Sequence, residues 1–226
     1  MHVFDDDDRD RIHDAEVDVV DLEWVAGDGG HAGLVRLDVR RRAGASRFLA
    51  AVLVAGEEPV VVLDHELPPV TGRFELRAPG VWTELCCETP LDHWTVGLEA
   101  FGLALPATTV VTPDSLGDRT PLGLDLDLDT VEAPVATGGG FEIAVRVHGE
   151  VLLGDRAIEL DGTGIRRRRW DGTRPTSDRL GSPPPFVGEL SVAWPPEDGP
   201  PTVERRAWFV GSRPGWCRPT DDQSWV

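Results

Sequence analysis

The stretch that decides the fold is 140-GFEIAVRVHGEVLLGDRAIELDG-162. Every second residue from Phe141 to Val147 is apolar, and this is the period of a β-strand with one buried face. Gly154-Asp155 then separates V-L-L from R-A-I-E-L as a two-residue turn would, with glycine supplying the positive φ of the first turn position. The stretch therefore predicts an antiparallel β-hairpin.

Strand-like patterns continue on both sides of this hairpin. In 121-PLGLDLDLDT-130, leucines alternate with glycine and aspartate, which predicts a strand with one apolar and one polar face. Further strand-like runs are 16–25, 33–41, 47–55, 58–67, 72–78, 81–88, 93–105, 163–170, 186–194 and 203–210. No long window keeps helical periodicity without a glycine or proline. We therefore expect an all-β fold with little helix, in which antiparallel strands form a barrel or sandwich.

Two proline-containing connections divide the chain. Residues 106–120 hold Pro106 and Pro113, and residues 172–185 hold a run of three prolines. Such stretches punctuate regular structure and mark long connections. The expected order is an acidic arm (1–13), an N-terminal antiparallel β lobe (14–105), a C-terminal β lobe carrying the arginine-rich motif (121–210) and an irregular tail (211–226).

Charge and composition exclude several functions. The chain has 226 residues, with 22 arginines, no lysine, 40 acidic residues and a formal net charge of −18. This charge repels phosphate backbones and anionic lipids, so we expect neither nucleic acid nor membrane as a partner. No apolar run is long enough to span a bilayer, and the acidic N-terminus does not resemble a signal or transit peptide. Three cysteines form a poor disulfide framework, so the expected location is the cytoplasm.

Motifs that carry chemistry are few. The six histidines include no His-x-His and no His-x-x-x-His pair, and neither Cys-x-x-Cys nor G-x-S-x-G occurs. We therefore expect no metal and no cofactor, although His65, His93 and His148 could still converge in space. The aspartates of L-D-L-D-L-D-T would lie roughly 6 to 7 Å apart along one strand, a spacing that favours a solvated face over a calcium loop.

The most unusual stretch is 162-GTGIRRRRWDG-172. In a strand, Arg166 and Arg168 would point to one face and Arg167 and Arg169 to the other. A buried guanidinium is tolerated only where it is paired or hydrogen-bonded. Both faces of the predicted strand must therefore offer carboxylates, water or a ligand.

This arginine stretch also carries a family resemblance. Together with 93-HWTVGLE-99, 121-PLGLDLDLD-129 and the hairpin that precedes it, it resembles the lipocalin-like proteins grouped with carotenoid hydratases and AttH proteins. The family motif has the form G-x-R-D-H-S-W-G. Gly164, Arg166 and Trp170 match its glycine, first arginine and tryptophan. Arg167 to Arg169 replace the aspartate, histidine and serine, and Asp171 replaces the final glycine.

The resemblance implies a two-lobed lipocalin-like architecture of antiparallel, barrel-like domains around an apolar cavity. Characterised relatives hydrate, cyclise or isomerise isoprenoid or polyketide-like substrates. The replaced positions have lost the groups best suited to moving a proton, because arginine does not deprotonate in the ordinary pH range. The departure from the motif therefore favours binding over catalysis.

We accordingly predict a lipocalin-like protein that binds a small, largely apolar, isoprenoid- or polyketide-like molecule. The predicted ligand-binding residues are Trp94, Asp125, Asp127, His148, Arg166, Arg168 and Trp170. A diverged hydratase, cyclase or isomerase is the first alternative, so enzymatic activity stays open, as does the oligomeric state.

Two further interpretations stay open. In one, Asp125, Asp127 and Asp129 lie opposite the arginines, and the two runs only neutralise each other as cross-strand pairs. In the other, the protein is a non-catalytic interaction module whose exposed tryptophans bind a partner.

Overall fold

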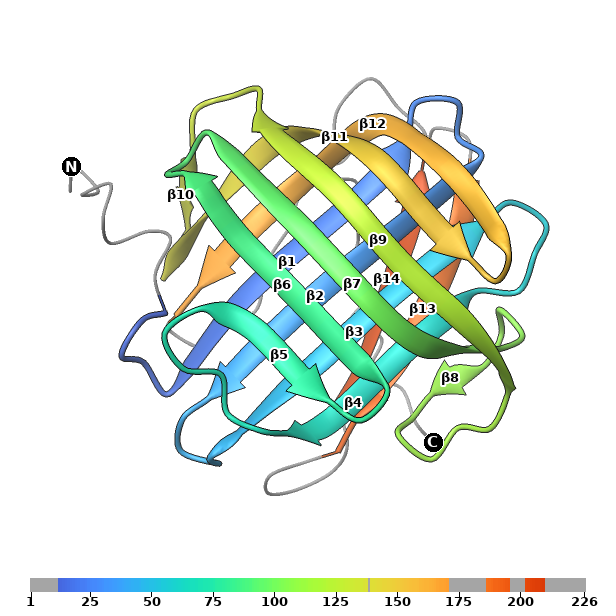
Figure 1. Cartoon of the computed structure of the whole chain (residues 1–226), viewed down its shortest axis with the longest axis horizontal. Helices are drawn as coiled ribbons and strands as arrows, with labels where there is room; N and C mark the ends of the chain where they lie inside the picture. The colour runs from blue at the N-terminus through green and yellow to red at the C-terminus, as the bar shows by residue number, and fades with distance from the viewer. Residues whose placement is uncertain (1–11, 138, 171–185, 196–201, 210–226) are drawn as a thin grey trace, which may run out of the picture.

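The computed structural model describes residues 12–137, 139–170, 186–195 and 202–209, and these residues form an all-β fold (Figure 1). The expectation of antiparallel strands with little helix is confirmed, since every regular element of the described residues is a strand. The strands are β1 (Val17–Ala26), β2 (His31–Arg40), β3 (Ala45–Val54), β4 (Val60–Leu67), β5 (Phe74–Ala78), β6 (Val81–Thr89), β7 (His93–Ala104), β8 (Val110–Val111), β9 (Asp118–Thr130), β10 (Val135–Thr137), β11 (Gly140–Leu153), β12 (Arg156–Arg169), β13 (Phe186–Trp194) and β14 (Thr202–Phe209).

Most of these strands belong to one sheet that closes on itself. Its order is β10-β11-β12-β1-β2-β3-β4-β7-β6-β5, and β9 pairs with both β7 and β11. Within the described residues, the eight strands β11, β12, β1, β2, β3, β4, β7 and β9 therefore form a closed antiparallel barrel (Figure 1). Closure removes the free edges that an open sheet would expose.

The barrel wall is weakest between β4 and β7. The recorded ladder between these strands joins Val60 to Ala104 and Val61 to Leu103. Farther along the same side of β7, its neighbour is β6, and β5 lies beyond β6. The β5–β6 hairpin therefore extends the sheet beside the part of β4 that follows Val61 (Figure 1).

A second, smaller sheet covers part of the barrel from outside. It has the order β14-β13-β8, with β13 and β8 parallel. Leu190, Val192 and Trp194 of β13 pack in one buried apolar cluster with residues such as Leu34 and Leu49 of the barrel wall. The outer face of β2 and β3 is thus a buried surface.

The main core lies inside the barrel, and Trp24 of β1 and Trp94 of β7 are its largest buried side chains. Gly33 of β2 and Gly164 of β12 are the residues opposite Trp24 on the two neighbouring strands. A Cβ atom at Gly33 would lie 2.2 Å from Cζ2 of Trp24. Glycine at this position therefore gives the indole the room that it occupies.

The hairpin prediction is confirmed in detail. Leu153 pairs with Arg156 across the turn, and Gly154 has a φ of 65°. The runs 156–162 and 163–170 join into the single strand β12.

Strands of the two predicted lobes are hydrogen-bonded to each other, since β1 pairs with β12 and β7 with β9. The division into lobes stays a prediction. Residues 1–11 of the expected arm, 171–185 and the tail 211–226 lie outside the described residues.

Candidate functional site

The arginine run divides between two buried environments. Arg166 and Arg168 share a face of β12 with Gly164, which lies beside Trp24 in the barrel interior. Arg167 and Arg169 lie on the opposite face, toward the second sheet. All four side chains are buried, and Arg168 is fully so. The alternation expected from the sequence is confirmed, and both faces of the strand turn out to be enclosed.

The inward-facing arginines lie on aromatic rings. The guanidinium carbon of Arg166 is 4.3 Å from the centroid of the Trp94 ring and 5.5 Å from that of Phe141. The corresponding carbon of Arg168 is 4.4 Å from the Phe74 ring. Desolvated cation–π contacts of this kind each stabilise by about 2 kcal/mol. They offset part of the cost of burying two cations in an apolar core.

Arg168 also has a carboxylate partner inside the barrel. Its Nη2 lies 2.8 Å from Oδ1 of Asp18, and both side chains are fully buried. The backbone N–H of His13 donates to Oδ2 of the same aspartate at 2.6 Å. Burial raises the pKa of Asp18, against the opposing effect of Arg168.

We call this region the arginine end of the barrel and define it by Asp18, Phe74, Trp94, Phe141, Arg166 and Arg168. It lies where β12 ends and where β1 and β11 begin, at the left of Figure 1. The connection from β4 to β5 reaches it, because Val70 packs in the barrel core and donates its N–H to Oγ of Ser46.

Two indole N–H groups in the interior have no acceptor. Nε1 of Trp94 at the arginine end, and Nε1 of Trp24 deeper along β1, are buried without a hydrogen-bond partner in the described part of the chain. An unsatisfied buried donor costs about 1 to 3 kcal/mol, so such groups are uncommon in folded proteins. They indicate places where a water or a ligand atom would be stabilised.

Trp170 lies at the rim of the same end. Its ring stacks on His13 with centroids 4.0 Å apart and meets Phe141 edge-on at 6.1 Å. It is half-buried. Of the predicted binding residues, Trp94, Arg166, Arg168 and Trp170 are therefore brought together.

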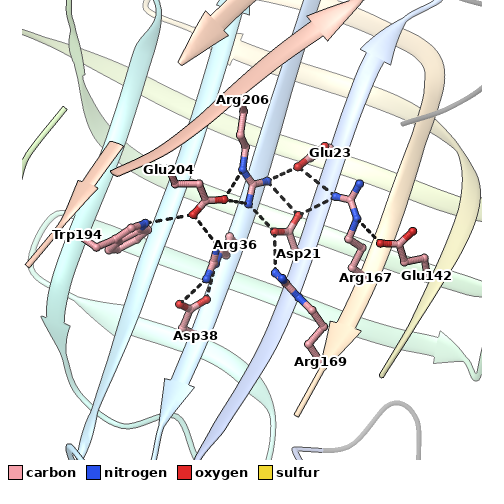
Figure 2. Close-up of polar contacts among 10 residues, drawn as sticks. All are labelled: Asp21, Glu23, Arg36, Asp38, Glu142, Arg167, Arg169, Trp194, Glu204 and Arg206. Atoms are coloured by element: carbon pink, nitrogen blue, oxygen red, sulfur yellow. Dashed lines mark hydrogen bonds and ion pairs between the residues drawn. The ribbon is translucent and has the colours of Figure 1, made fainter. Parts of the chain in front are cut away.

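The outward-facing arginines belong to a buried ionic network (Figure 2). Arg167 contacts Glu23 at 3.1 Å and Glu142 at 3.0 Å. Oδ2 of Asp21 forms two ion pairs. It lies 3.5 Å from Nη2 of Arg169 and 2.9 Å from Nη2 of Arg206, which belongs to β14. Burial alone would raise the pKa of Asp21, but Arg206 and Arg167 hold it far below its usual range.

The network continues across the outer face of β2. Arg36 contacts Asp38 at 2.6 Å and Glu204 of β14 at 2.8 Å, and Glu204 also contacts Arg206. Nε1 of Trp194 donates to Glu204 at 3.3 Å. Despite burial, Arg206 and Arg36 lower the pKa of Glu204 to about 2. This network is an ionic contact surface between the barrel and the second sheet.

The prediction that Asp125, Asp127 and Asp129 lie opposite the arginines is wrong. β9 pairs with β7 and β11, so these aspartates face residues of those strands. Most of the carboxylates that neutralise the run come from β1, where Asp21 lies directly opposite Arg167, and Glu142 of β11 contacts Arg167 as well. The stretch 17-VDVVDLEWVA-26 holds the sequence signal for this pairing. Its acidic residues fall on both faces of one strand, as the arginines of β12 do.

Asp127, His148 and Asp125 lie on the outer face of the barrel wall and not among the interior side chains of the arginine end. They alternate with the buried leucines and valines of β9 and β11, and Asp125 is exposed. His148 contacts Asp129 at 3.0 Å, and His93 contacts Asp129 at 2.9 Å and Asp127 at 3.3 Å. Hydrogen bonds from these two histidines lower the pKa of Asp129, and His148 has the larger effect.

This outer cluster is not a metal centre in the part of the chain that the structure describes, where no group of three or more ligand-type residues fits an ion. Among the same residues, no helix is both long and apolar enough to cross a bilayer.

Comparison of the chain with protein-family models, with curated proteins and with solved structures produced no match. The fold itself defines the class of protein, a closed antiparallel β-barrel with a covering sheet.

Proposed function

We propose that this protein is a diverged lipocalin-like barrel that binds a small, largely apolar molecule, isoprenoid- or polyketide-like in character, inside the barrel. The observation that carries the proposal is the arginine end, where apolar and aromatic side chains surround a small number of polar groups. This is the usual composition of a small-molecule site. A barrel of eight strands is also the size that holds either packed side chains or one small ligand.

We also propose that the protein acts in the cytoplasm. Cys86 of β6 carries a free thiol. Free thiols suit a reducing compartment. Cell fractionation tests this part of the proposal, and recovery of the protein outside the cytoplasm would contradict it.

The binding proposal is tested with a defined panel. An isoprenoid alcohol, a C12 fatty acid and an aromatic polyketide are added to the full chain, and complexes are detected by native mass spectrometry and by thermal shift. We expect at least one probe to be retained and to raise the melting temperature. If no probe in the panel binds, the proposal is contradicted.

A matched pair of variants tests whether the ligand lies in the interior. Phe141→Leu changes a fully buried ring of the arginine end, whereas Phe101→Leu changes a ring that is 55% exposed. The interior variant should weaken binding about tenfold, because it removes aromatic contact area, and the exposed variant should leave it unchanged. Equal effects of the two substitutions would contradict interior binding.

One observation favours catalysis as a second candidate function. Asp18 is a fully buried carboxyl group inside the barrel, and burial raises its pKa. A carboxyl group of raised pKa suits general acid catalysis, such as protonating a carbon–carbon double bond before water adds to the resulting cation. A retained isoprenoid would then gain the mass of one water over time. Asp18→Asn should abolish that gain while the isoprenoid still binds, and an unchanged isoprenoid would contradict this candidate.

A further inference from the structure

We propose that residues 68–73, the connection from β4 to β5, form a lid over the arginine end of the barrel, and that release of Val70 from the core opens the interior. We call this connection the strap (Figure 1). The opening is a property of the chain itself and is measured without a ligand. Its role as the entrance for a ligand rests on the proposed binding function.

The strap joins two separate parts of the arginine end. It begins after Leu67, which lies opposite Ser46 near the start of β3. It ends before Phe74, whose ring lies 4.4 Å from the guanidinium carbon of Arg168 on β12. Strands β1 and β2 separate β3 from β12 in the barrel wall. The strap therefore extends between groups that are distant along the sheet but belong to the same end of the barrel.

The anchor of the strap lies in the interior at this end. Val39 of β2 lies opposite Ser46 on one side and opposite Asp18 on the other, so the three residues form one row across β1, β2 and β3. All three are buried, and Val39 belongs to the main core. Oγ of Ser46 accepts the backbone N–H of Val70 at 3.2 Å. The strap is thus fastened in the same row as the carboxylate that contacts Arg168.

This anchor is small. The residues of the strap are exposed except for Val70, which is 6% exposed and packs in the main core. Pro68 and Pro69 have no backbone N–H to donate. Within the described part of the chain, the hydrogen bond from Val70 to Ser46 is the one that holds the strap to the barrel. Segments with few buried apolar contacts and few hydrogen bonds open locally at a much lower free energy than the whole fold.

The strap leads directly to the interior groups of the arginine end. The ring of Phe74, the residue after the strap, has its centroid 6.2 Å from that of Trp94. Trp94 is 2% exposed, and its Nε1 has no acceptor among the described residues. Because this N–H is shielded in the closed barrel, its exchange with solvent requires an opening that admits water. The Trp94 indole is therefore a reporter for release of the strap.

Native-state hydrogen exchange of the full chain, followed by NMR, tests the opening. Val70→Ala removes apolar area from the anchor and keeps its backbone donor. We expect the amide at position 70 and the indole N–H of Trp94 to exchange about tenfold faster, because the closed strap loses buried contact. Ser46→Ala removes the acceptor of the anchoring hydrogen bond and should act in the same direction. The indole of Trp82, which donates to Glu75 on the outer face at 3.4 Å, should keep its exchange rate.

Val151→Ala is the matched control, because it makes the same change in a side chain of β11 that is 0% exposed. It lowers the stability of the whole fold but leaves the anchor of the strap intact. The exchange rate of Trp94 should therefore stay within about twofold of the parent rate. Equal acceleration in the two variants would show that Trp94 exchanges through unfolding of the whole barrel, and the lid would be overturned. A Trp94 rate that Val70→Ala leaves unchanged would overturn it as well.

Binding kinetics test the strap as the entrance for a ligand. The probe is dodecanoate, the C12 fatty acid of the panel, and its binding is followed by stopped-flow tryptophan fluorescence. Val70→Ala should raise the association and dissociation rate constants together, each about tenfold, and change Kd by less than about threefold. If dodecanoate binds at the parent rates in this variant, the strap is not the entrance, while the binding function stands. If no probe of the panel binds but Trp94 exchange responds to Val70→Ala, the lid stands and the proposed function fails.

Discussion

Arg168 and Asp18 form an ion pair inside the barrel, with Nη2 2.8 Å from Oδ1 and neither side chain exposed to solvent. Their strands are neighbours, and Val20 is the residue directly opposite Arg168. The pair is therefore diagonal across the ladder, one alternation apart on the interior face. It joins the first strand of the barrel to the strand that carries the arginine run.

Removing one member of this pair should destabilise the protein strongly. Asp18→Ala leaves a buried guanidinium without its carboxylate, and breaking such pairs costs about 3 to 5 kcal/mol. Urea unfolding measures the loss. Asp161→Ala is the control, because its pair with Arg146 is exposed and should contribute at most about 1 kcal/mol. Similar losses in the two variants would contradict the buried pair.

The ionic network should fasten the second sheet to the barrel. Arg206→Met removes the cation that contacts Asp21, Glu23 and Glu204. We expect a loss of about 3 kcal/mol and faster amide hydrogen exchange in β13 and β14, with β11 and β12 still protected. Arg205→Met, one residue earlier on β14 and half-buried, should change stability by about 0.5 kcal/mol or less. Uniformly faster exchange across the barrel would contradict a local role.

Because the pKa of Glu204 is lowered in the folded protein, we expect the protein to lose stability in acid. Its pKa is about 2 in the folded protein against 4.5 for a free side chain, so its contribution is complete above pH 4.5 and is lost as the pH falls toward 2. The contribution is on the order of 3 kcal/mol. Urea unfolding between pH 6 and pH 2.5 should show a smaller acid loss in Glu204→Gln than in the parent. Parallel pH profiles would contradict this assignment.

Gly33 should tolerate no side chain while Trp24 is present. A Cβ at Gly33 would overlap the Trp24 ring, so Gly33→Ala should cost about 1 to 3 kcal/mol. Trp24→Leu removes the overlapping ring atoms but leaves the carbonyl oxygen of Ala51, which would lie 2.7 Å from the same Cβ, so adding Gly33→Ala to it should cost less but still destabilise. The unfolding free energies of the parent, the two single variants and the double variant give the coupling free energy between the two substitutions. Strict additivity would show that the two positions do not compete for space.

Local periodicity was sufficient to predict the strand class, the hairpin at Gly154 and the two faces of the arginine run. It could not predict which strand lies beside that run, because the register of β1 on β12 joins residues about 150 positions apart. The carboxylates are those of Asp18, Asp21 and Glu23 on β1 and of Glu142 on β11, rather than the aspartates of β9. Phe74 was missed for the same reason, since the barrel brings it to Arg168 from a distant part of the chain. Phe141 could have been found by continuing the register of the predicted hairpin, which places it opposite Arg168 and beside Arg166.

We expect a ligand bound inside the barrel to reach the buried indole of Trp94. The ¹⁵N-indole NMR spectrum of the full chain during titration with dodecanoate tests this, with each resonance assigned by a Trp→Phe variant. We predict that the Trp94 N–H resonance shifts with saturation, because its nitrogen gains an acceptor, while that of Trp82 on the outer face stays in place. A Trp94 resonance that does not move at saturating dodecanoate would contradict the account.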